Sequence, residues 1–158
     1  MNLIPLIETS RGDTPECWHF GAIAVTDLHG KLIAHAGNPE HLTFTRSTLK
    51  AMQALPFIQK KGHEFFNYQA PQLAMLCASH NGEENHVEQA STMLEKAGLN
   101  YKALKCGCHI PSLFEAINQS PPNNLTYDER HHNCSGKHSG FVSYCVQHGH
   151  TLDDYIDP

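Results

Sequence analysis

Ser47 and Lys50 have the residue types and the spacing that serine chemistry needs. They lie three residues apart in the segment 46–50. Residues three apart on a helix face the same side. A neutral Lys50 amine could therefore take the proton of the Ser47 hydroxyl and make that oxygen a nucleophile. Taken alone, the same pattern also fits an ordinary helix start that is capped by Thr45 and carries a solvated lysine.

A second serine, Ser79, stands directly before His80 and shortly before Gly82. A hydroxyl beside an imidazole could hold a substrate or relay protons. The alternative is a Ser-Asn-Gly turn in which the histidine has no chemical role. The apolar run 71–77 precedes this segment and predicts a buried helix, so we expect Ser79 to lie where that helix ends.

The segment 134–138 places a thiol, an amine and an imidazole within five residues, as Cys134, Lys137 and His138. At a helix start the thiolate form of Cys134 is favoured, and a thiolate can bind metal or react. The alternative is a buried cysteine at a glycine-rich helix start. The segment 106–109 also holds cysteines and a histidine, but its spacing is not that of a zinc finger, so we interpret it as a tight loop.

The elements that must position these residues follow from the apolar pattern. It predicts a hairpin of strands 18–25 and 31–36 joined by a turn at 27–30. It predicts helices over 47–62, with a kink or restart at Pro56, and over 71–77, 85–97, 114–118 and 141–146. No linker separates these elements, and 158 residues are enough for one domain with a hydrophobic core.

The composition excludes several classes of protein. The chain has 158 residues, of which 40% are hydrophobic and 17% charged, as in a globular domain. A net charge of −5 and the lack of a basic run argue against a nucleic-acid partner. No apolar stretch is long enough to span a membrane. Because the first residues do not form a signal peptide, we expect a cytoplasmic protein whose six cysteines are reduced. The 13 histidines, several of them beside cysteines, raise a metal-site hypothesis.

Four motifs occur in one order along the chain. They are Arg-Ser-x-x-Lys, Cys-Ala-Ser-His-x-Gly-Glu-x-x-His, Cys-Gly-x-His-x-Pro and Asn-Cys-Ser-Gly-Lys-His. Together they resemble the bacterial asparaginase II family, the Rhizobium-type L-asparaginases. The resemblance begins at Thr9 and reaches Gly149, so it covers nearly the whole sequence.

The resemblance implies both a fold and a reaction. The fold would be α+β, a mixed sheet with helices similar to the serine β-lactamase and glutaminase architecture. Residues 1–158 would be the N-terminal portion of a single domain of this kind, incomplete at its C-terminus. The reaction would be hydrolysis of L-asparagine to L-aspartate and ammonia. Ser47 and Lys50 match the family's Ser-Lys pair, and Ser79 matches its second active-site serine.

The same resemblance assigns further roles. Arg46, His80 and His138 would contact the substrate. Cys134 and Lys137 match a zinc-binding cysteine and lysine, so zinc is the expected cofactor. The full-length family form is expected to be a homodimer.

The sequence also departs from the family pattern. Cys17 stands where the family usually has serine, and Ala51 follows Lys50 where the family has proline. Family chains are longer, and their lysine partner of Ser79, a further cysteine ligand and a supporting aspartate would lie beyond Pro158. We therefore expect residues 1–158 alone to be poorly soluble and to lack turnover. The alternatives are an inactive remnant, a zinc-binding module without amidase activity, and Ser-Lys chemistry on glutamine or a β-lactam.

Overall fold

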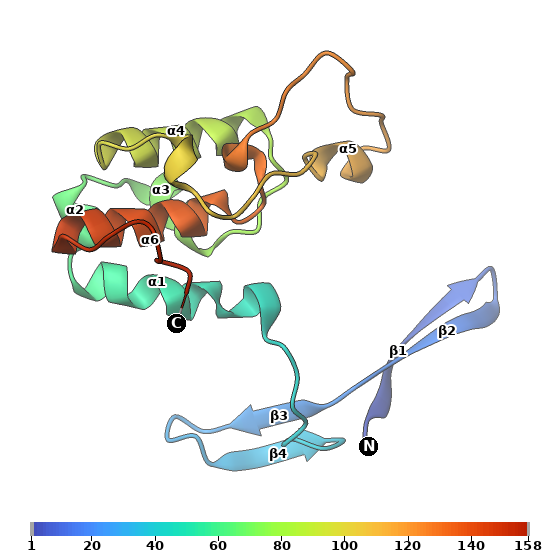
Figure 1. Ribbon diagram of the computed structural model, residues 1–158. Coiled ribbons are helices and arrows are strands. Elements are labelled where there is room, and N and C mark those ends of the chain that lie inside the picture. Colours follow the sequence, from blue (N-terminus) through green and yellow to red (C-terminus); the bar gives the residue numbers. More distant parts are fainter. Residues whose placement is uncertain (1, 158) are drawn as a thin grey trace. The chain divides into compact units, whose positions relative to one another are not determined.

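The computed structural model describes residues 2–157, which form an α+β protein as predicted (Figure 1). The chain divides into two compact units, Met1–Phe44 and Thr45–Pro158. We call them the strand unit and the helical unit. All strands of the described residues belong to the first, and all helices belong to the second.

The strand unit consists of two antiparallel hairpins. Strand β1 (Ile4–Arg11) pairs with β2 (Thr14–Gly21), and β3 (Ile23–Thr26) pairs with β4 (Leu32–Ala36). The second hairpin confirms the predicted turn, in which Gly30 adopts a φ of 79°. The predicted first strand was too long, because residues 18–21 pair with β1 instead. Within residues 2–157 the strands make two separate sheets of two strands each, not the one mixed sheet expected.

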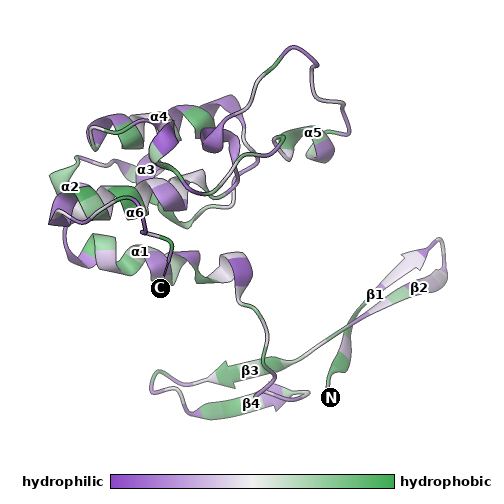
Figure 2. Cartoon of the chain, viewed as in Figure 1, coloured by the Kyte–Doolittle hydropathy of each residue, from purple (hydrophilic) through white to green (hydrophobic). Residues whose placement is uncertain are grey.

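The strand unit has no buried side chain among residues 2–44. Large apolar side chains on its hairpins are exposed, among them Trp18 at 55% and Phe20 at 60%. Figure 2 shows that hydrophobic residues occupy much of β3 and β4. This unit therefore lacks a hydrophobic core of its own.

The helical unit contains the core of the described chain. Its helices are α1 (Lys50–Gln59), α2 (Gly62–Phe65), α3 (Ala70–Cys77), α4 (Glu84–Lys96), α5 (Leu113–Ala116) and α6 (Ser135–His148), with short 3-10 helices η1 (Arg46–Leu49), η2 (Tyr101–Ala103) and η3 (Glu129–His131). Helix α6 packs against α1, α3 and α4 (Figure 1). No helix of the described residues is both long and apolar enough to cross a membrane.

Two hydrophobic clusters hold the helical unit together. The larger contains Phe57, Phe66, Tyr68, Met75, Leu76, Ala90, Met93 and Ala97. The smaller contains Leu94, Leu104 and Val142. Leu94 in α4 and Ala97 at its end belong to these clusters, so the apolar periodicity identified the helix 85–97 correctly.

Helix α6 begins at Ser135, six residues before the predicted start at residue 141. Its first turns consist of polar residues and glycines, a composition that predicts a loop. Ser139 Oγ donates to the carbonyl oxygen of Ser135 at 2.9 Å, and Ser143 Oγ donates to that of Ser139 at 2.7 Å. These bonds to the preceding helical turn satisfy the hydroxyls, so the polar face can be buried.

Two glycines bring α6 close to α3. A Cβ on Gly136 would overlap the backbone of Met75, and one on Gly140 would overlap the side chain of Leu76. The approach places the start of α6 beside the end of α3. Those two helix ends carry the residues described next.

Candidate functional site

Lys50 is a buried lysine at the start of α1, with only 2% of its surface exposed. Its Nζ lies 2.6 Å from Ser79 Oγ, 2.5 Å from the carbonyl oxygen of Ala78 and 3.4 Å from that of Asn133. Among the described residues, none of its hydrogen bonds goes to Ser47. This pairing differs from the one inferred from the sequence, which joined Lys50 to Ser47 and left Ser79 without a lysine in this chain.

The surroundings of Lys50 suit both of its protonation states. An ammonium group has three N–H donors, and three acceptors lie around Nζ. A neutral amine keeps two N–H groups for the two carbonyl oxygens, and its lone pair then faces Ser79 Oγ. The Ser79 hydroxyl can donate to that lone pair. The geometry therefore allows a proton to pass from Ser79 to Lys50.

A cavity of about 350 Å³ adjoins this amine. It is lined by Arg46, Ser47, Lys50, Gln53, Asn133, Cys134 and Lys137. Five of the residues singled out in the sequence thus lie around one space, although they come from two segments of the chain. Ser79 joins them through its bond to Lys50.

Ser47 lies in the short 3-10 helix η1, and Lys50 is the first residue of α1. Arg46 has a φ of 48°, which is uncommon for a residue with a Cβ. Thr45 makes no side-chain cap, contrary to the prediction, and instead its carbonyl accepts from Thr48 Oγ1 at 2.5 Å. Ser47 is exposed at the cavity, whereas Lys50 extends inward between α3 and α6.

The cavity is positively charged. Arg46, Lys50 and Lys137 contribute three cationic groups, and none of the described residues that line it is Asp or Glu. Cations without nearby carboxylates favour an anionic ligand. A carboxylate is such a ligand.

His80, predicted to bind substrate, is 4% exposed and uses both ring nitrogens within the protein. Its Nδ1 accepts from the Gly82 N–H at 3.1 Å, so the proton lies on Nε2, which donates to Ser135 Oγ at 2.8 Å. Ser135 Oγ in turn donates to the carbonyl oxygen of Arg130 at 2.9 Å. This network links the end of α3 to the start of α6 and leaves no ring nitrogen for a ligand.

His138 is also buried, and its partner is Tyr155. Tyr155 Oη accepts from the Lys105 N–H at 2.6 Å and lies 2.7 Å from His138 Nδ1. Burial raises the pKa of Tyr155 to about 12, so its hydroxyl stays protonated and can donate to His138. Burial, followed by the charge of Lys137, lowers the pKa of His138 to about 4.

The fit of a zinc ion depends on Cys134 and Lys137, which line the same cavity. Residues 2–157 contain no group of three or more His, Cys, Asp or Glu side chains that could hold a metal. His132 Nδ1, which belongs to the same segment, accepts from the Cys134 N–H at 3.0 Å. A zinc site needs about three or four protein ligands. Cys134 and Lys137 would be only two ligands, so the described residues do not by themselves make a complete zinc site.

Three residues at or near the site were not found from the sequence. Gln53 follows Lys50 by three residues, so helical spacing could have indicated it. Asn133 acts through its backbone carbonyl, for which side-chain motifs give no signal. Tyr155 reaches His138 through tertiary packing alone.

Comparison with known proteins identifies one family. The family described as L-asparaginase II matches residues 7–158 of this chain. A search of curated proteins found no match.

Proposed function

The chain belongs to the L-asparaginase II family, and on that premise we propose that it hydrolyses the side-chain amide of L-asparagine to L-aspartate and ammonia. The observation that carries the mechanism is the 2.6 Å contact between Lys50 Nζ and Ser79 Oγ. A resemblance of the whole fold to serine β-lactamases is part of the same proposal.

Lys50 acts as the general base. In its neutral form it accepts the proton of Ser79 while Ser79 Oγ attacks the amide carbon. The resulting ammonium then gives that proton to the departing nitrogen, so ammonia leaves and an ester on Ser79 remains. Water attacks the ester, again with Lys50 as base, and releases aspartate and the free hydroxyl.

The cavity supplies the binding energy and the orientation. Arg46 and Lys137 attract the α-carboxylate of the substrate, since the lining residues carry no carboxylate that would compete. Ser47, exposed at the same cavity, is the second hydroxyl that can contact the substrate.

The proposal departs from the loss of turnover expected for residues 1–158, because the contact with Lys50 gives Ser79 a lysine within this chain. Ammonia release from L-asparagine by the 158-residue chain tests it. Lys50→Met should lower turnover by at least about 100-fold, because it removes the base. Lys60→Met, an exposed lysine after the same helix, is the matched control and should change little. Retention of most turnover in a folded Lys50→Met protein would refute the mechanism.

The position of the acyl group decides between the two serines. Mass spectrometry of peptides from acid-quenched enzyme should find the ester on Ser79. Ser79→Ala should abolish the ester, whereas Ser120→Ala at an exposed position should not. An ester on Ser47 would return to Ser47 the nucleophilic role predicted from the sequence. A panel with glutamine and a β-lactam establishes which substrate is preferred.

Zinc binding by Cys134 and Lys137 stays a prediction, and no step of the proposed reaction uses the metal. Both ligands must be deprotonated, so affinity should fall at low pH. Metal content measured with and without Cys134→Ala tests it. Equal zinc in both proteins would reject Cys134 as a ligand.

A further inference from the structure

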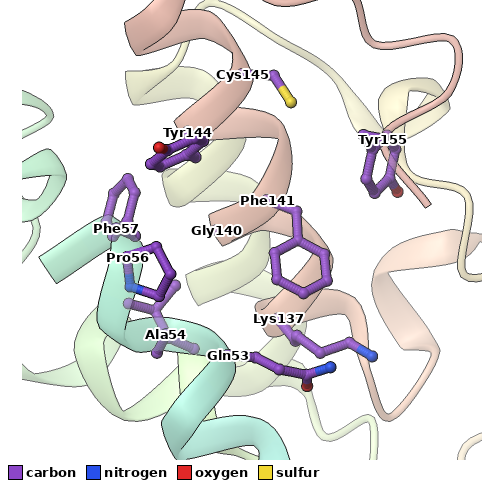
Figure 3. A pocket seen from close by; sticks show the side chains of 11 residues that line it. Gln53, Ala54, Pro56, Phe57, Lys137, Gly140, Phe141, Tyr144, Cys145 and Tyr155 are labelled. Carbon is purple, nitrogen blue, oxygen red and sulfur yellow. The ribbon is translucent and has the colours of Figure 1, made fainter. Parts of the chain in front are cut away.

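A second cavity, of about 190 Å³, lies between α1 and α6 (Figure 3). It is lined by Gln53, Ala54, Pro56, Phe57, Leu76, Lys137, Gly140, Phe141, Tyr144, Cys145 and Tyr155. Most of these side chains are aliphatic or aromatic. An apolar cavity of about 150 Å³ holds a benzene ring, so this one has room for a phenyl group or a short alkyl chain.

The apolar cavity adjoins the proposed active site. Gln53 and Lys137 line both cavities, one from α1 and the other from α6. Figure 3 shows the two side chains at one end of the apolar cavity. Lys137 Nζ lies 5.6 Å from the centre of the Phe141 ring, so a cation stands at this boundary. A ligand with a carboxylate and an apolar group could therefore occupy both spaces at once.

The charges of the two cavities restrict what else the ligand can carry. None of the described residues that line either cavity is Asp or Glu. A free α-ammonium group on the substrate would therefore meet the cations of Arg46 and Lys137 without a carboxylate partner. An acylated α-nitrogen is neutral and avoids this repulsion.

We infer that the apolar cavity is a subsite for the acyl group of an Nα-acylated asparagine, whose carboxylate and side-chain amide occupy the cationic cavity. The inference rests on the proposed function and names its preferred substrate class. The bond that breaks is still the side-chain amide bond, so the products are ammonia and the Nα-acylated aspartate. The acyl group contributes binding through burial of its apolar surface.

Competing substrates test the inference on the 158-residue chain. Nα-benzoyl-L-asparagine should have a kcat/KM at least about tenfold above that of Nα-acetyl-L-asparagine, as expected for burial of one ring. Ala54→Leu fills the cavity and should reduce this ratio, whereas Ala51→Leu, exposed on the same helix, should preserve it. An equal kcat/KM for the two substrates would overturn the subsite.

A binding measurement separates the subsite from the reaction. The product Nα-benzoyl-L-aspartate should slow alkylation of Cys145, which lines the cavity and is 9% exposed, and should leave alkylation of the exposed Cys77 unchanged. Protection of Cys145 without ammonia release from any substrate would keep the subsite and reject the reaction. Ammonia release from L-asparagine without protection would keep the reaction and reject the subsite. Absence of both would reject both.

Discussion

His80 is neutral in the folded protein at neutral pH. Burial lowers its pKa to about 4, and the neighbouring charges of His86, Lys50, His132 and His109 add to the shift. An exposed histidine in the unfolded chain has a pKa of about 6.5. Between these values the unfolded chain binds a proton that the folded chain does not. Stability should therefore fall as the pH drops from about 6.5 to about 4, by on the order of 3 kcal/mol from His80.

Denaturant unfolding at successive pH values measures this loss. His80→Asn, whose side-chain oxygen can still accept from the Gly82 N–H, should show a weaker pH dependence over the same range. His29→Asn, at an exposed turn, should keep the wild-type dependence. An identical pH dependence of stability in all three proteins would show that His80 has the same pKa in the folded and the unfolded protein.

The roles of Lys50 and His80 show what residue spacing can and cannot predict. Residue spacing indicated Lys50 as a candidate base, because Ser-x-x-Lys is a local pattern. It could not identify the hydrogen bond to Ser79, since that contact joins residues 29 positions apart and depends on how α1, α3 and α6 pack. The Ser79-His80 pair was also noted, but the burial of the imidazole follows from tertiary structure.

At the scale of elements, α6 and α3 are held together by backbone contact at Gly136. A methyl group there overlaps the Met75 carbonyl, which belongs to a helix and cannot turn aside. Gly136→Ala should therefore destabilise the protein by about 3 kcal/mol, despite the better helix propensity of alanine. It should also lower ammonia release, because a displaced α6 moves the Asn133 carbonyl away from Lys50.

Gly140→Ala is the matched control, one turn along the same helix. Its methyl group meets the end of the Leu76 side chain, which can change rotamer, so the loss of stability should be smaller. Thermal melts of the two variants give the comparison. Equal stability of Gly136→Ala and the wild type would show that the two helices separate at no cost.

The elements differ in how well the sequence predicted them. The helix 85–97 was recognised within one residue at each end, because its apolar periodicity is strong. Strand β1 was missed, since its eight residues do not alternate between apolar and polar side chains. The start of α6 was missed because Ser135, Ser139 and His138 have the composition of a loop, whereas their burial is made possible by hydrogen bonds.

At the scale of the whole molecule, stability is concentrated in the helical unit. Both hydrophobic clusters lie within it, whereas the strand unit has no buried side chain among residues 2–44. An isolated two-stranded hairpin is marginal in water. A fragment of residues 45–158 should therefore unfold cooperatively, with a midpoint close to that of the 158-residue chain.

The same distribution predicts that the strand unit promotes association. Its exposed apolar side chains and unpaired strand edges can pair with other copies, which agrees with the poor solubility expected from the sequence. Light scattering should show larger particles for residues 1–158 than for 45–158 at equal concentration. Phe20→Lys in β2 should reduce their size, whereas Leu125→Lys, exposed in the helical unit, should not. The prediction would be contradicted if the 158-residue chain were monomeric and its backbone amides in residues 2–44 were protected from hydrogen exchange. Such protection would mean that the strands are covered within the monomer.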